Sequence, residues 1–126
     1  MIYGIGTDIV AIARMQALWQ RHGERSLDKI LAPAERADCL ASAEPARFMA
    51  KRFAAKEALG KALGTGIRAP ALLSEIGVTH DALGKPGFVF GPQLAEHMSA
   101  HALRASLSIS DEKDFAVAFV VIEKHD

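Results

Sequence analysis

The longest segment with helical periodicity is ARFMAKRFAAKEALGKAL, residues 46–63. Projected at 100° per residue, its large apolar side chains, from Phe48 to Leu63, fall within an arc of roughly 140°, as expected for a helix face that packs on a core. Pro45 precedes the segment, where a first-turn proline is tolerated, and Gly64-Thr65-Gly66 follows it, where glycine favours a helix end. The pattern predicts one long helix packed against the rest of the protein.

Two cations interrupt the apolar face of this predicted helix. Arg52 and Lys56 project between apolar residues, while Glu57 lies at the edge of the face and Lys61 stands one turn beyond it. One interpretation is that Arg52 and Lys56 extend along apolar surface or neutralise a buried acid. The other is that the charges form a functional site, which two cations within one turn favour.

The rest of the sequence predicts a mixture of helices and strands. Amphipathic spacing predicts further helices over residues 12–22, 27–31, 33–43 and 92–103. Apolar runs bounded by turn residues predict strands over residues 2–9, 75–80, 87–90, 106–110 and 115–122. The last of these strands is apolar on both faces, which indicates a central position in its sheet. We therefore expect one α+β domain, residues 1–126, with helices packed on a small antiparallel sheet.

The composition excludes several classes of function. The chain has 126 residues, with 15 basic and 15 acidic side chains. Nucleic acid is not an expected partner, because a protein that binds it extensively needs a net basic surface. No apolar run approaches the roughly 20 residues that span a bilayer, no amino-terminal leader is apparent, and the single cysteine cannot form an internal disulfide. We expect a cytoplasmic protein with no membrane association and with Cys39 as a small core residue.

Asp8 is a second unusual residue, because it lies within the apolar sequence IGTDIV, residues 5–10. It could be a solvated strand end or the N-cap of the helix that follows. It could also join Glu57 as an oxygen ligand of Mg²⁺, which commonly binds one or two carboxylates and completes its shell with water and phosphate oxygens. The donors to the phosphate groups would then be Arg52, Lys56, Lys61 and the backbone amides of Gly64, Thr65 and Gly66.

Two stretches of the sequence are similar to the signature motifs of a known family. They are MIYGIGTDIV, residues 1–10, and RFAAKEALGKALGTGI, residues 52–67. The similarity continues through Gly84-Lys85-Pro86, Ser108 and residues 112–122, so it covers nearly the whole chain. The chain resembles the holo-[acyl-carrier-protein] synthase family, the short-chain group of 4′-phosphopantetheinyl transferases.

This resemblance implies a single 4′-phosphopantetheinyl transferase domain with the fold of that family. The implied reaction moves the phosphopantetheine arm of coenzyme A to a serine of apo-acyl carrier protein, releases adenosine 3′,5′-bisphosphate and serves fatty-acid synthesis. The family's Mg²⁺ ligands match Asp8 and Glu57, and a coenzyme A phosphate contact matches Lys61. The residues that match the family's nucleotide-side wall are Gly64, Thr65, Gly66 and Pro86.

The resemblance places the catalytic roles on Glu57 and Lys61 but leaves the proton acceptor open. The serine proton could pass to Glu57 or to a metal-bound water, and we favour the water, because a ligating carboxylate loses basicity. Ser106 and Asp111 stand where many family members have histidine. Any role of those imidazoles therefore does not transfer to this chain.

The resemblance also implies partners and an assembly. Arg14 matches a position that the family uses to dock its acidic carrier protein, and Arg21 and Arg25 extend the same basic side, although an ordinary solvated face is the alternative for these two. Family members of this length are homotrimers with coenzyme A bound where subunits meet. Two other functions stay open: a metal-dependent hydrolase of coenzyme A or another nucleotide pyrophosphate, and a noncatalytic module that binds an acidic carrier.

Overall fold

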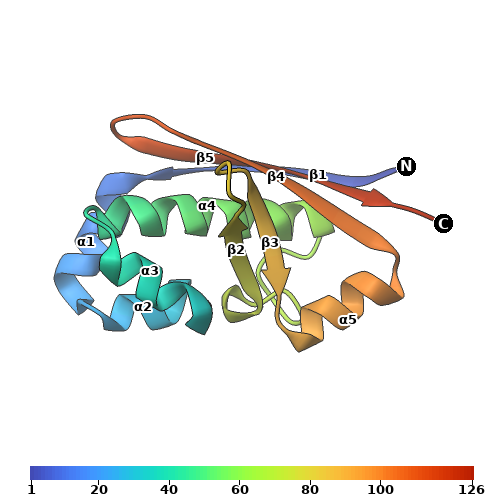
Figure 1. The fold of residues 1–126 in the computed structure, drawn as a ribbon, viewed down its shortest axis with the longest axis horizontal. Coiled ribbons are helices and arrows are strands. Elements are labelled where there is room, and N and C mark those ends of the chain that lie inside the picture. The colour runs from blue at the N-terminus through green and yellow to red at the C-terminus, as the bar shows by residue number, and fades with distance from the viewer.

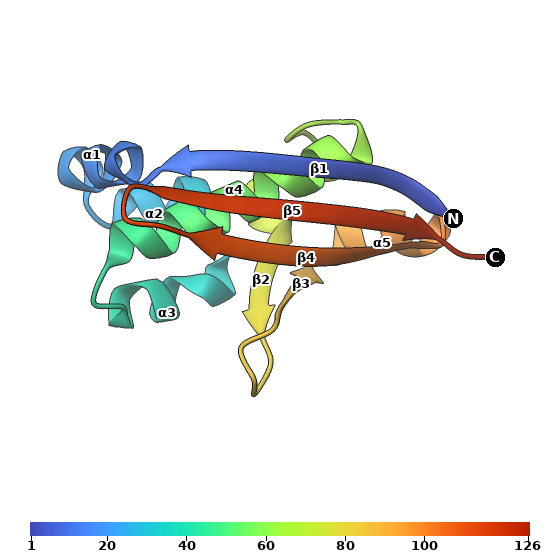
Figure 2. The ribbon, with the colours of Figure 1, turned by 90° about the horizontal axis from the view of Figure 1, so that it is seen from above.

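A three-stranded antiparallel sheet forms one layer of the protein. The computed structural model describes residues 1–126 and places β1 (Ile2–Ala11), β5 (Phe115–Lys124) and β4 (Leu103–Asp111) side by side in that order (Figure 2). β5 pairs with a neighbour along each of its two edges. The predicted central position of the last strand is therefore confirmed.

The long helix α4 (Pro45–Leu63) runs along one face of this sheet (Figure 1). Glycine in β1 permits an unusually close approach, because a Cβ on Gly4 or Gly6 would lie 2.0 Å from a carbonyl oxygen of Ala62 or Ala58. The backbones of β1 and α4 are thus in direct contact. Side chains at the facing edges of the two elements are consequently brought together.

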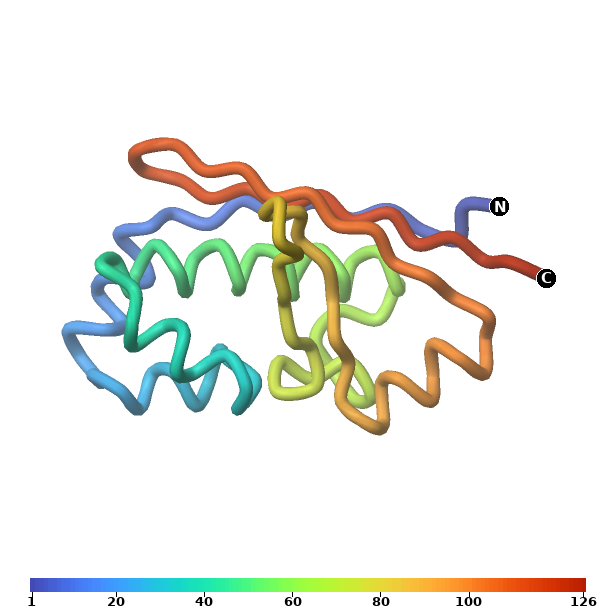
Figure 3. Tube along the Cα trace, in the orientation of Figure 1, coloured from blue at the N-terminus to red at the C-terminus, as the bar shows by residue number.

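The remaining elements lie on the other side of α4 or beside it, as the trace in Figure 3 also shows. Between β1 and α4 these are α1 (Ile12–His22), α2 (Arg25–Ile30), the 3₁₀ turn η1 (Pro33–Glu35) and α3 (Arg36–Ala41). After α4 they are the 3₁₀ turn η2 (Leu73–Glu75), the two-stranded sheet of β2 (Ile76–His80) and β3 (Pro86–Phe90), and α5 (Pro92–Ala100). Because α4 lies between two layers, most of its residues are buried, including Arg52 and Lys56.

The two faces of the three-stranded sheet differ in exposure. The side chains that point toward α4, such as Val10, Ala118 and Val120, are buried in the core. The opposite face is apolar but open to solvent in the single chain. Its large exposed residues are Ile5 at 59%, Ile9 at 62%, Phe115 at 47%, Val117 at 37% and Phe119 at 45%. An apolar patch of this extent is typical of a surface that a partner covers.

The predicted α+β class is confirmed, and the differences from the predicted elements are local. The segment 33–43 is not one helix, because Pro33 begins a separate 3₁₀ turn before α3. α5 ends at Ala100 rather than at 103, because Leu103 already begins β4. Cys39 is fully buried in the core, as expected. None of the helices combines the length and the hydropathy that a membrane-spanning helix requires.

Candidate active site

An acid and a cation meet at the outer edge of β1. β1 is an edge strand, and Asp8 follows Gly4 and Gly6 at two-residue spacing, so its side chain lies on the face that packs on α4. The Lys61 ammonium, from the last turn of α4, is 3.0 Å from Asp8 Oδ1 and donates a second hydrogen bond of 2.9 Å to the carbonyl oxygen of Thr7. The structure thus brings Asp8 and Lys61 together.

Glu57 belongs to the same cluster. It lies one turn before Lys61 on α4 and is partly buried. Burial raises the pKa of the Glu57 carboxyl and the nearby negative charge of Asp8 raises it further, whereas Lys61 and Arg14 oppose the rise. A carboxylate that lies beside a second negative charge in this way is an arrangement that a bound cation would stabilise.

The donor set suits a hard divalent cation whose shell is completed from outside the chain. Asp8 and Glu57 offer carboxylate oxygens, and no group of three or more His, Cys, Asp or Glu side chains could hold a metal ion anywhere in the protein. Mg²⁺ is commonly bound by one or two carboxylates together with waters and substrate phosphates. The cluster therefore fits Mg²⁺ better than a metal that requires a full set of protein ligands.

Lys56 lies elsewhere, and the expectation that it donates to phosphate is wrong. Its side chain is 0% exposed, and its ammonium is 2.5 Å from Glu35 Oε1 and 2.8 Å from the carbonyl oxygen of Ile30. A third acceptor is the carbonyl oxygen of Leu73. Burial lowers the pKa of the Lys56 ammonium, while the Glu35 carboxylate opposes that shift. The other interpretation, neutralisation of a buried acid, describes this residue.

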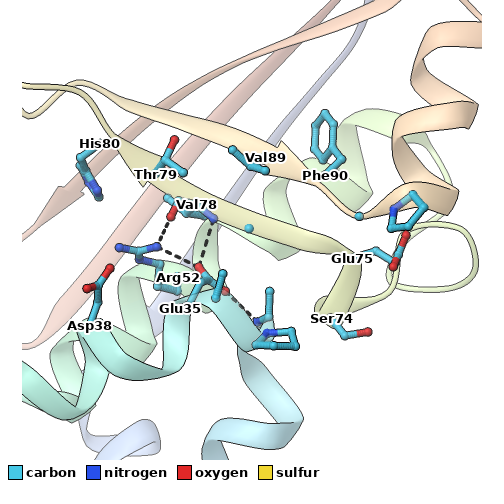
Figure 4. A pocket seen from close by; sticks show the side chains of 16 residues that line it. Glu35, Asp38, Arg52, Ser74, Glu75, Val78, Thr79, His80, Val89 and Phe90 are labelled. Atoms are coloured by element: carbon cyan, nitrogen blue, oxygen red, sulfur yellow. Dashed lines mark hydrogen bonds and ion pairs between the residues drawn. The ribbon is translucent and has the colours of Figure 1, made fainter.

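Arg52 also pairs with Glu35, but unlike Lys56 it lines a cavity. Its guanidinium is 2.9 Å from Glu35 Oε2, donates to the carbonyl oxygen of Val78 and lies 4.4 Å from the centre of the Phe48 ring. Figure 4 shows Arg52 and Glu35 beneath β2. Both residues line a cavity of about 880 Å³. This cavity does not include Asp8, Glu57 or Lys61. Arg52 is thus not part of the cluster at the edge of β1.

The acid Glu35 is an organising residue that we did not identify from the sequence. It is 3% exposed and also accepts hydrogen bonds from the backbone amides of Ala32 and Val78. The Glu35 hub, defined as Glu35, Arg52 and Lys56, therefore ties η1 and β2 to α4. No buried side-chain nitrogen or oxygen in the protein lacks a hydrogen-bond partner.

The amides after α4 are also not free to bind phosphate, which corrects that part of the sequence-based expectation. The backbone N–H of Gly64 donates to the carbonyl oxygen of Lys61 at 3.0 Å, and those of Thr65 and Gly66 donate to Gly60 at 3.2 Å and 3.0 Å. Gly64 has a φ of 83°, so it ends the helix in the left-handed conformation. The glycines act first as a helix stop.

Three residues noted in the sequence, Pro86, Ser106 and Asp111, lie at the β4 edge of the sheet, opposite to the β1 edge that carries Asp8. Pro86 begins β3, which contacts β4, whereas Gly64–Gly66 follow the end of α4 beside β1. Figure 2 shows the β2–β3 connection and the loop after α4 beyond opposite edges of the sheet. Ser106 and Asp111 belong to β4, and Asp111 pairs with Arg47 at 2.9 Å and with Lys51 at 3.7 Å. One chain therefore does not bring Pro86 to Asp8.

Of the basic residues in the first two helices, Arg14 lies near the Asp8–Glu57 cluster, and Arg21 and Arg25 follow it along the chain. Arg14 is exposed on α1, lies 5.2 Å above the centre of the Phe53 ring and acts electrostatically on Glu57. Arg21 is exposed in the last turn of α1, and Arg25 is exposed at the start of α2. An acidic partner on this surface would lie close to the Asp8 and Glu57 carboxylates.

Comparison with known proteins finds one family along almost the entire chain. The model of the 4′-phosphopantetheinyl transferase superfamily matches residues 4–120. A holo-[acyl-carrier-protein] synthase of Dechloromonas aromatica is 61% identical over 123 residues, which are 98% of each chain.

Solved structures agree with the sequence matches. The crystal structure of holo-[acyl-carrier-protein] synthase from Neisseria meningitidis has a TM-score of 0.95 and 49% identity, covering 98% of this chain and 100% of that one. A Bacillus anthracis synthase in complex with CoA (3′,5′-ADP) has a TM-score of 0.83 and 35% identity, covering 99% of both chains. The fold seen here is thus shared by two proteins that are both named holo-[acyl-carrier-protein] synthase.

Proposed function

The chain belongs to the 4′-phosphopantetheinyl transferase superfamily, and from this membership we propose that it transfers the phosphopantetheine arm of coenzyme A to a carrier-protein serine. The relatives that match nearly its full length are named holo-[acyl-carrier-protein] synthase, and one of them is described with bound CoA (3′,5′-ADP). In this reaction the serine oxygen forms a bond to the phosphorus of the arm. The bond from that phosphorus to adenosine 3′,5′-bisphosphate breaks.

The observation that carries the proposal is the meeting of Asp8, Glu57 and Lys61 at one edge of β1. Asp8 and Glu57 would hold Mg²⁺, which neutralises charge on the diphosphate when it is bound. Lys61 is half exposed and can reach diphosphate oxygens from the same side. Together these groups orient a phosphorus centre and offset its negative charge, as phosphoryl-type transfer requires.

The reaction can be tested directly with purified components. The chain, apo-acyl carrier protein, coenzyme A and Mg²⁺ are incubated together, and the carrier is weighed by mass spectrometry with and without a chelator. We expect the carrier to gain one phosphopantetheine group only when the cation is present. Cleavage of coenzyme A with no change in carrier mass would indicate a hydrolase instead, and an unmodified carrier with intact coenzyme A would contradict both.

The carrier is proposed to dock on the basic surface formed by Arg14, Arg21 and Arg25. Replacing Arg14 with Glu should raise the KM for the acidic carrier about tenfold at low salt, because like charges slow the encounter. The KM for coenzyme A should stay unchanged. Steady-state kinetics with each substrate varied in turn measures both constants. Lys124→Glu, which makes the same charge reversal at the end of β5, is the control, and an equal loss in this variant would contradict a specific docking surface.

We further propose that the active assembly is a homotrimer with each site completed by a second copy. Two observations support it: the apolar outer face of the sheet is uncovered, and Pro86 lies at the edge opposite to Gly64–Gly66 and Asp8. Two copies placed edge to edge would bring these residues to one ligand. Sedimentation equilibrium should show three chains per particle, and a monomer that retains full activity would refute the assignment.

A further inference from the structure

Lys61 occupies a position from which it can compete with a metal ion. Its ammonium is paired with Asp8 Oδ1 at 3.0 Å and with the carbonyl oxygen of Thr7 at 2.9 Å. It also follows Glu57 by four residues, the favourable order for an acid and a lysine on one helix. A single cation thus offsets the charge of the two carboxylates that would hold Mg²⁺.

The two partners of this ion pair differ in freedom. The Asp8 side chain is 18% exposed and projects from β1 on the face that packs on α4, whereas the Lys61 side chain is 52% exposed. A half-exposed lysine can rotate about its flexible stem, and an ion pair near the surface is weak, so the ammonium can leave Asp8 without disturbing the core. Lys56 cannot act in this way, because Glu35 and two carbonyl oxygens hold it inside the protein.

We propose that Lys61 makes binding of the divalent cation depend on the coenzyme A diphosphate. The ammonium pairs with Asp8 until a diphosphate arrives, and it then turns to the phosphate oxygens and leaves the carboxylate to the cation. The inference rests on the proposed function, because it requires a diphosphate and a cation at this site. It adds an order of events: the cation binds tightly only together with the substrate.

Elementary electrostatics gives the size and the direction of the effect. Two charges a few ångströms apart at a protein surface interact by one or more kcal/mol, and the interaction energy of a dication with a given charge is twice that of a monovalent ion. Removing the positive charge of Lys61 should therefore strengthen binding of a divalent cation to the free chain by about tenfold. The coupling is reciprocal, so coenzyme A and the cation should each tighten binding of the other in the native chain.

Mn²⁺ binding to the full chain tests the proposal without an activity assay. Free Mn²⁺ is measured by electron paramagnetic resonance, with and without saturating coenzyme A. Lys61→Met should bind Mn²⁺ about tenfold more tightly than the native chain when coenzyme A is absent. With coenzyme A present the two should differ little, so the tightening caused by coenzyme A should shrink by the same factor.

Three further variants separate the possible causes. Lys61→Arg keeps the charge and should behave like the native chain, while Lys51→Met removes a cation from the same helix far from Asp8 and should leave Mn²⁺ affinity unchanged. Equal or weaker Mn²⁺ binding by Lys61→Met would overturn the inference, and so would a matching gain in Lys51→Met. Asp8→Asn should lose Mn²⁺ binding, and retention of affinity in this variant would overturn both the inference and the metal site of the proposed function.

Discussion

Asp8→Asn should reduce phosphopantetheine transfer by at least about a thousandfold, because a divalent cation that neutralises a reacting diphosphate is worth several kcal/mol. Asparagine matches aspartate in size but lacks the charge. It should therefore weaken binding of the cation without altering the packing of β1 on α4. The ion pair with Lys61 is half exposed, and its loss should change the thermal midpoint little. The carrier mass assay and a circular dichroism melt measure the two effects.

The control for this variant is a second aspartate that also has a cationic partner. Asp28 lies on α2 and pairs with Arg36 at 2.7 Å, away from the Asp8 cluster. Asp28→Asn should transfer at the native rate. High Mg²⁺ should partly restore Asp8→Asn, because the remaining carboxylate of Glu57 still attracts the ion. Full activity of Asp8→Asn at low Mg²⁺ would remove Asp8 from the proposed metal site.

Part of the Asp8, Glu57 and Lys61 cluster could be predicted from the sequence, because strand and helix periodicity determine which face of β1 or α4 each side chain occupies. Strand alternation places Asp8 on the same face as Gly4 and Gly6, and helix periodicity places Lys61 one turn after Glu57. The family motifs then suggested that the two segments act together. What the sequence did not show is the Asp8–Lys61 pairing itself, which depends on how closely the glycines let β1 approach α4.

The roles of Lys56 and the residues after α4 could not be predicted from local patterns. The partner of Lys56 is Glu35, 21 residues earlier, and only the folded chain shows that the two meet. The amides of Gly64–Gly66 are consumed by the last turn of α4, whose unpaired carbonyls any helix end must satisfy. In the first case a tertiary ion pair, and in the second the helix cap, uses the hydrogen-bond donors that a ligand would need.

The sequence predicted the place of β5 in the sheet but not the exposure of the sheet's outer face. The sequence of β5 shows apolar residues on both faces, which predicts its central position but not what covers each face. α4 covers one, and the other is open in the single chain. Within one chain Pro86 likewise lies at the sheet edge opposite to Asp8 and Gly64–Gly66. Features that the proposed assembly would create between copies leave only an indirect trace in one sequence.

Glu35→Ala should lower the free energy of unfolding by about 3–5 kcal/mol, because it leaves Arg52 and Lys56 buried without their shared anion. The backbone amides of Ala32 and Val78 would also lose their acceptor. Glu35 is 3% exposed, so water can replace little of what is lost. Chemical denaturation of the native chain and the variant, with the midpoint and slope both fitted, measures the difference.

Lys56→Met shows whether the loss arises from unbalanced charge or from a damaged core. Methionine fills the volume of the lysine stem, and the remaining pair of Glu35 and Arg52 is neutral, so this variant should be less destabilised than Glu35→Ala. The double variant Glu35→Ala/Lys56→Met should be more stable than the sum of the single effects predicts, since the second change removes a charge that the first left unpaired. Strictly additive losses would mean that the two residues stabilise the protein independently, and the Glu35 hub would then not be a coupled ionic unit.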